Sequence, residues 1–223
     1  MIKREKKMKK LTLLALTGLL LSSFMGSVVY ASTIYDNGAP NQLNGNEMTQ
    51  WIQTEDFRLS ATRTFNEVKF WAVVSTDGTY TGNITYYIYG DNAGIPGNIL
   101  STGNLPVPAV ATGMNTSFGS ELLLDFPIAA FTANANTLYH LGLHNGPIDH
   151  NTRDNFYWET TNGNLTTTGI EWELPNGSWS NNFQEHAFQL LGDAAAVPEP
   201  ATMLLLGSGL IGLAAFARRK FKK

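Results

Sequence analysis

The chain has 223 residues, of which 15% are charged, and it contains no Cys. The absence of Cys excludes a disulfide-stapled small domain, a thiolate zinc finger, an iron–sulfur protein and a cysteine nucleophile. Six of the 15 Lys and Arg residues precede Tyr30 and five follow Ala217, so the stretch from Ser32 to Val197 keeps four basic residues against 16 acidic ones, a net charge of −12. A body of that charge will not bind nucleic acid by neutralising phosphates.

The N-terminal segment predicts a secretory signal peptide over residues 1–31. Residues 1–10 are basic, residues 11–25 are mostly apolar, and Val29-Tyr30-Ala31 fits a small-x-Ala cleavage site before Ser32. This layout is typical of a helix that signal peptidase removes after export. The alternative is an uncleaved membrane helix, but an apolar core of about 14 residues is short for a permanent span.

Residues 32–193 predict one all-β domain, an antiparallel β-sandwich or jelly roll. Roughly ten short runs with alternating or continuous apolar residues are separated by turn residues, without a long helical period. In the run 67–74, Val68, Phe70, Ala72 and Val74 share one face, and in the run 83–89 Ile84, Tyr86 and Ile88 lie opposite Thr85, Tyr87 and Tyr89. The other expected strands are 51–60, 98–102, 116–124, 137–144, 155–160, 165–173 and 183–190. Asp77-Gly78, Asn162-Gly163 and Asn176-Gly177 are hairpin-type turn signals, and Asp91-Asn92-Ala93-Gly94 reads as a turn.

The sequence favours a body that is not an enzyme and holds no cofactor or metal, because the usual catalytic motifs are missing. His140 and His144 share a strand face near Asp149, His150 and Asp154, a set that could hold zinc or calcium. The simpler interpretation is a polar, solvent-facing strand face, with Tyr139, Leu141 and Leu143 pointing inward.

Two further residue sets allow alternative functions. Glu171 and Glu173 share a strand face, with Glu159 and Glu185 as possible neighbours, and a glycoside hydrolase needs two such carboxyl groups. With 16 acidic residues in this body, a chance pairing is the simpler interpretation. The aromatic rings of Trp158, Trp172 and Trp179, with Tyr87 and Tyr89, could stack on sugars and make the domain a carbohydrate-binding module. Aromatic residues are also the usual filling of a sandwich core.

The C-terminal segment, residues 194–223, predicts a linker and a membrane helix. Residues 201–217 carry no charge and would span roughly 25 Å as a helix, the lower limit for crossing a bilayer. The basic tail 218–223, with Arg218, Arg219 and Lys220 as stop-transfer residues, stays cytoplasmic, so the body faces outward. The glycines at 207, 209 and 212 spell a dinucleotide-type motif, but no strand–turn–helix unit surrounds them, and they favour helix packing in lipid.

Val197, Pro198, Glu199 and Pro200 precede the apolar span, and the two prolines impose an extended segment accessible to a processing enzyme. In order, the Val-Pro-Glu-Pro segment, the Gly-containing apolar span and the Arg-Arg-Lys cluster resemble the PEP-CTERM sorting signal of Gram-negative bacteria. The resemblance implies recognition of Pro198, Glu199 and Pro200 by an exosortase, removal of the tail, and delivery to the envelope or extracellular matrix. Such sorting systems generally occur together with exopolysaccharide production. A plain C-terminal anchor is the alternative.

The body resembles the "choice-of-anchor" type of domain that is often joined to such tails. The likeness lies in segments 34–38, 68–71, 88–97, 156–159 and 185–192. It implies an extracellular β-sandwich without a defined activity. The sequence thus predicts an exported protein, first anchored in the inner membrane and then released to the outer surface or matrix, with a structural or adhesive role in exopolysaccharide or biofilm.

Overall fold

The computed structural model describes residues 31–163, 168–193 and 209–210. The chain divides into two units, Met1–Tyr30 and Ala31–Lys223, and all described residues belong to the second. Apart from Ala31, the predicted signal peptide therefore lies outside the described residues, as does nearly all of the predicted sorting signal. Within the described part of the chain, no helix is long and apolar enough to cross a membrane.

Thirteen strands make up the described part of the body, which is all-β as predicted. They are β1 (Ala31–Asp36), β2 (Pro40–Glu47), β3 (Trp51–Arg58), β4 (Arg63–Ser75), β5 (Asn83–Asn92), β6 (Ile95–Pro106), β7 (Ala109–Asn115), β8 (Gly119–Ala133), β9 (Leu138–Asn145), β10 (Phe156–Thr161), β11 (Ile170–Glu173), β12 (Trp179–Asn181) and β13 (Phe188–Asp193).

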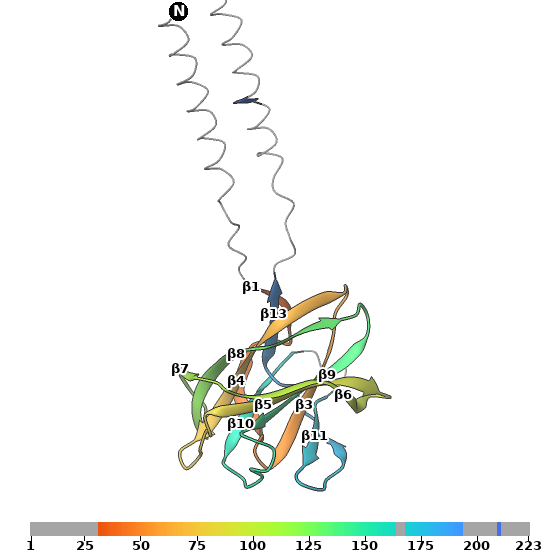
Figure 1. Ribbon diagram of the computed structural model, residues 1–223. Coiled ribbons are helices and arrows are strands. Elements are labelled where there is room, and N and C mark those ends of the chain that lie inside the picture. Colours follow the sequence, from red (N-terminus) through yellow and green to blue (C-terminus); the bar gives the residue numbers. More distant parts are fainter. Residues whose placement is uncertain (1–30, 164–167, 194–208, 211–223) are drawn as a thin grey trace, which may run out of the picture. The chain divides into compact units, whose positions relative to one another are not determined.

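The strands form two antiparallel sheets, as a β-sandwich requires (Figure 1). The seven-stranded sheet has the order β1-β13-β4-β10-β2, with β8 on the other edge of β4 and β7 beside β8. The six-stranded sheet has the order β12-β11-β3-β9-β5-β6. The long strand β4 is the central strand of the seven-stranded sheet. Strand β8 pairs with one of its edges from Arg63 to Ser75, and β13 and β10 pair with the other edge.

The core lies between the sheets and follows the predicted alternation. Val68, Phe70 and Ala72 of β4 and Ile84, Tyr86 and Ile88 of β5 are all buried in one apolar cluster. That cluster also takes residues from β3, β8, β9, β10 and β13, so both sheets contribute to it. Thr85, Tyr87 and Tyr89 lie on the outer face of β5, as the period of two predicts.

The predicted turns have different outcomes. Asn176-Gly177 joins the antiparallel pair β11 and β12 and is a hairpin turn. Asp91–Gly94 also lies at a hairpin, because Asn92 of β5 pairs with Ile95 of β6. Asp77-Gly78 forms a turn, with the Gly78 amide donating to the Ser75 carbonyl at 2.9 Å, but it connects two different sheets. A hairpin there was the wrong expectation, because the chain crosses to the other layer instead of pairing back.

The chain enters and leaves the sandwich at the same place. Strand β1 pairs with β13, and Ala31 lies opposite Asp193 (Figure 1). The hairpin of β11 lies at the other end of the sandwich in that view. The first and last strands of the described body therefore lie side by side at one edge of the seven-stranded sheet.

Candidate functional site

An aromatic surface lies on the outer face of the six-stranded sheet. It consists of Tyr87 and Tyr89 of β5, Trp172 of β11 and Trp179 of β12, with Ile52 and Leu174 packed against them. The ring centroids are 5.4 Å apart for Tyr87 and Tyr89, 5.5 Å for Tyr89 and Trp179, and 5.2 Å for the two indoles. We call this set the aromatic surface.

Gly142 allows these rings to meet across the sheet. Tyr89 and Trp179 lie on strands that β11, β3 and β9 separate in the sheet order, yet their rings are in contact. A Cβ at Gly142 of β9 would lie 2.8 Å from the Tyr89 ring, far inside van der Waals contact. The missing side chain therefore makes the space over β9 that the Tyr89 ring occupies.

The two indoles are the accessible part of the aromatic surface. Tyr87 and Tyr89 are only 9% and 5% exposed, whereas Trp172 and Trp179 are half-buried. Burial raises the pKa of both tyrosine hydroxyls above the usual value, so the phenols stay neutral at physiological pH. A ligand at this surface would contact indole faces first.

Trp158 is a correction to the sequence prediction, because it cannot contact a glycan. Its side chain is 0% exposed, and it packs edge-on against Phe70 and Phe188 in the core. The indole Nε1 donates a hydrogen bond to the Ala187 carbonyl at 3.0 Å. Strand β10 turns this ring inward, so its role is packing.

The histidines of β9 are also corrected, because they do not face solvent. His140 and His144 are 2% and 0% exposed. Both ring nitrogens of His144 face carbonyl oxygens, of Gly146 at 3.0 Å and Thr49 at 2.7 Å, and burial lowers its pKa. His140 Nε2 lies 3.0 Å from Asp91 Oδ1. No group of three or more acidic or histidine side chains placed to hold a metal occurs among the described residues.

The carboxyl groups proposed for hydrolysis face amides and not a cavity. Glu171 accepts a hydrogen bond from Gln53 at 3.0 Å, and Glu173 accepts one from Gln50 at 3.1 Å. The described cavity, of about 530 Å³, is lined by neither of them. Glu159 and Glu185 belong to other, buried groups of side chains.

The first of these groups joins Glu55 of β3 to Glu185 and His186, which precede β13. The His186 ring Nδ1 lies 2.8 Å from Glu55 Oε2, and its Nε2 lies 3.1 Å from Asn46 Oδ1. Burial lowers the pKa of His186 to about 3 and raises that of Glu55 well above its usual value. Both shifts disfavour the charged forms of this buried pair, and Glu55 Oε2 also accepts a hydrogen bond from the His186 backbone amide at 2.9 Å.

Glu185 lies beside this pair. Its Oε2 accepts a hydrogen bond from Asn37 at 3.3 Å, while its Oε1 is buried without a partner among the described residues. Burial, and then the neighbouring Glu55 carboxyl, raise the pKa of Glu185 to about 8. Glu185 therefore carries a proton at neutral pH.

A second buried group lies on the outer face of the seven-stranded sheet. Glu159 of β10 and Glu121 of β8 are 0% and 3% exposed, and one carboxyl oxygen of each is buried without a hydrogen-bond partner among the described residues. Burial, and then the Glu121 carboxyl, raise the pKa of Glu159 to about 8. Neither buried group could be predicted from the sequence, because the residues that form it lie far apart in the chain.

The comparison with protein-family models places one motif in this chain. Residues 196–220 match the PEP-CTERM protein-sorting motif, a range that includes Val197–Pro200 and the Arg218–Lys220 cluster. The matched residues lie outside the described part of the structure, apart from 209 and 210. Among curated proteins, none matches this chain. The chain is thus an all-β protein with a C-terminal sorting motif, and that motif supports a secreted protein that an exosortase system sorts, from a membrane-anchored precursor to the envelope.

Proposed function

We propose that this chain is a non-enzymatic protein of the outer surface or extracellular matrix, with a structural or adhesive role in exopolysaccharide. The observation that supports it most is the sorting motif at 196–220 behind an all-β sandwich. Signal peptidase cuts between Ala31 and Ser32, the C-terminal helix holds the precursor in the membrane, and the exosortase removes the tail at Pro198–Pro200. We also propose that the β-sandwich body is a domain of the choice-of-anchor type.

Mass analysis of the mature protein tests the processing. In a strain that has the sorting enzyme, we expect a product that begins at Ser32 and has lost the tail near residue 199. A Glu199→Gln variant serves as the matched control and should keep its tail. An intact tail on the unaltered chain in such a strain would contradict the proposal.

A second candidate function is carbohydrate binding through the aromatic surface. The specific observation is that Trp172 and Trp179 are in contact and half-buried at one end of the sandwich. Flat indole faces can stack on sugar C–H faces in such a position. If the domain binds carbohydrate, the two indoles would contact the polysaccharide directly and so account for the adhesive role.

Pull-down with purified exopolysaccharide tests the second candidate. We expect the double variant Trp172→Ala/Trp179→Ala to lose most of the binding. The control is Trp71→Ala, which removes a half-buried indole from the other sheet. Equal binding by all three proteins, or none by the unaltered chain, would leave the aromatic surface with a packing role. We do not propose hydrolysis, because Glu171 and Glu173 line no described cavity.

A further inference from the structure

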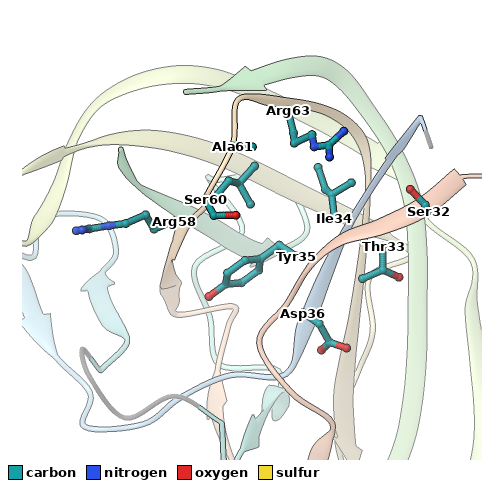
Figure 2. A pocket seen from close by; sticks show the side chains of 10 residues that line it. Ser32, Thr33, Ile34, Tyr35, Asp36, Arg58, Ser60, Ala61 and Arg63 are labelled. Atoms are coloured by element: carbon teal, nitrogen blue, oxygen red, sulfur yellow. The ribbon is translucent and has the colours of Figure 1, made fainter. Parts of the chain in front are cut away.

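A cavity of about 530 Å³ lies at the end of the sandwich where the chain enters and leaves. Strand β1 forms one wall, and the connection between β3 and β4 forms the other. Figure 2 shows Arg58 and Arg63 at the two ends of this connection, with Tyr35 reaching toward it from β1. The lining thus includes two arginines, one at each end of this connection.

These two arginines differ from the other cations of the body. Lys69 pairs with Asp125 at 3.2 Å, and Arg153 donates hydrogen bonds to Asn155 and Tyr157. Arg58 and Arg63 are exposed and have no hydrogen-bond or ion-pair partner among the described residues. In a body with 16 acidic residues, two unpaired cations at one cavity are a marked local excess of positive charge.

Asp36, the carboxylate in the lining, cancels only one of these two positive charges, so the lining keeps a formal charge of +1. Both Asp36 oxygens accept hydrogen bonds, from the Gly38 amide at 2.9 Å and from Gln189 at 3.0 Å. The predicted cleavage before Ser32, which also lines the cavity, would add a terminal ammonium group there. The lining therefore favours an anion that guanidinium groups bind through two oxygens, a phosphate or a carboxylate.

We propose that this cavity binds the phosphate of an anionic phospholipid headgroup at the membrane surface. The proposal rests on the membrane-anchored precursor of the proposed function. Ala31 pairs with Asp193, and only seven residues, 194–200, lie between Asp193 and the predicted span at Ala201. The eight Cα–Cα steps from Asp193 to Ala201 reach at most about 28 Å when fully extended. The cavity therefore stays close to the bilayer while the precursor is anchored.

Calorimetric titration of the full chain in polyoxyethylene detergent micelles tests this site. The probes are inorganic phosphate, glucuronate, and dihexanoyl phosphatidylglycerol below its micelle concentration. We expect saturable binding of phosphate and of the phospholipid, and Arg58→Gln/Arg63→Gln should weaken it at least about tenfold because two charge-assisted contacts are lost. The matched control, Lys69→Gln/Arg153→Gln, removes the same charge and should change binding less than about twofold.

Three results would overturn the proposal. They are the absence of saturable binding to the phospholipid, equal weakening by both double variants, and tighter binding of glucuronate than of the phospholipid. The last result would assign the cavity to an acidic polysaccharide. The Trp172→Ala/Trp179→Ala variant, which alters the aromatic surface, should still bind phosphate at the cavity. Removal of the tail, which tests the proposed function, is measured separately by mass analysis. Failure of the anion site is therefore distinguishable from failure of the proposed function.

Discussion

At the residue scale, the unusual feature of this protein is its set of buried carboxyl groups with raised pKa values. Glu55, Glu159 and Glu185 are almost completely buried, and each has a raised pKa. Three carboxyl oxygens in these groups and in Glu121 lack a partner in the described structure. A buried, unpaired negative charge would be very costly, so protonation is the state that fits the fold.

Because of these protons, stability should fall as the pH rises from 6.5 to 9. The unfolded chain releases its glutamate protons near pH 4.5, whereas folded Glu159 and Glu185 hold theirs until about pH 8. Across that window the folded state binds more protons, so the free energy of unfolding decreases with pH. His186, with a folded pKa of about 3, acts in the opposite direction only below pH 6.5.

Thermal unfolding at pH 6.5 and pH 9 measures this effect. We expect the unaltered chain to melt at a lower temperature at pH 9, and Glu185→Gln to reduce the difference because an amide cannot ionise. The control is Asp149→Asn, which removes an exposed loop carboxylate and should keep the full difference. A melting temperature that rises toward pH 9 would show that these carboxyl groups are ionised in the fold.

At the element scale, the hairpin of β5 and β6 shows a mismatch between residue and backbone. Ala93 and Gly94 form its two-residue loop, with φ values of 56° and 88°. Positive φ at both positions is the geometry for which Asn-Gly is preferred, and alanine is strained there. The sheet partners of β5 hold the loop in this conformation.

We therefore expect Ala93→Asn to stabilise the protein by about 0.5–1 kcal/mol, because asparagine tolerates the left-handed region better. Denaturant unfolding gives the free energy directly. Ala130→Asn, at an exposed position in β8, should bring no gain. Unchanged or reduced stability of Ala93→Asn would mean that the turn carries no strain.

The β11–β12 hairpin shows which contacts the sequence pattern can predict and which it cannot. The Asn-Gly turn was predicted and found, and the two indoles that flank it come together across the pair. The contact of Trp179 with Tyr89 could not be predicted, since it depends on the sheet order and on the missing Cβ of Gly142. Trp158 was grouped with these indoles from the sequence, although its strand turns it into the core.

At the scale of the whole molecule, the body is strongly acidic: its formal net charge is −12 when every carboxyl group is counted as ionised. Lys69–Asp125 is the one ion pair of a lysine or arginine among the described residues. Added salt therefore weakens few attractive interactions between opposite charges. Raising the ionic strength from 10 to 150 mM shortens the screening length from about 30 to about 8 Å and reduces the repulsion between carboxylates.

We expect the melting temperature to rise over that range of sodium chloride, and choline chloride should act equally if screening is the cause. Arg58→Gln/Arg63→Gln should show the same rise, which separates screening from chloride binding at the cavity. A melting temperature that falls with salt would show that attractive charge pairs outweigh the repulsion.

The sequence by itself determined the features that are written in contiguous residues. The sorting motif, the uneven charge, the all-β class and the inward and outward faces of β4 and β5 all follow from neighbours within a few positions. A strand has a period of two, so its two faces can be predicted locally.

Only the tertiary structure decided what covers each face and which distant residues meet. Glu55 and His186 are 131 positions apart, and Arg58 and Arg63 form a cavity only because β1 pairs with β13 beside them. Burial and charge pairing depend on sheet order and on the packing of one sheet on the other. A single strand's pattern does not contain that information, since the same alternation fits any partner strand.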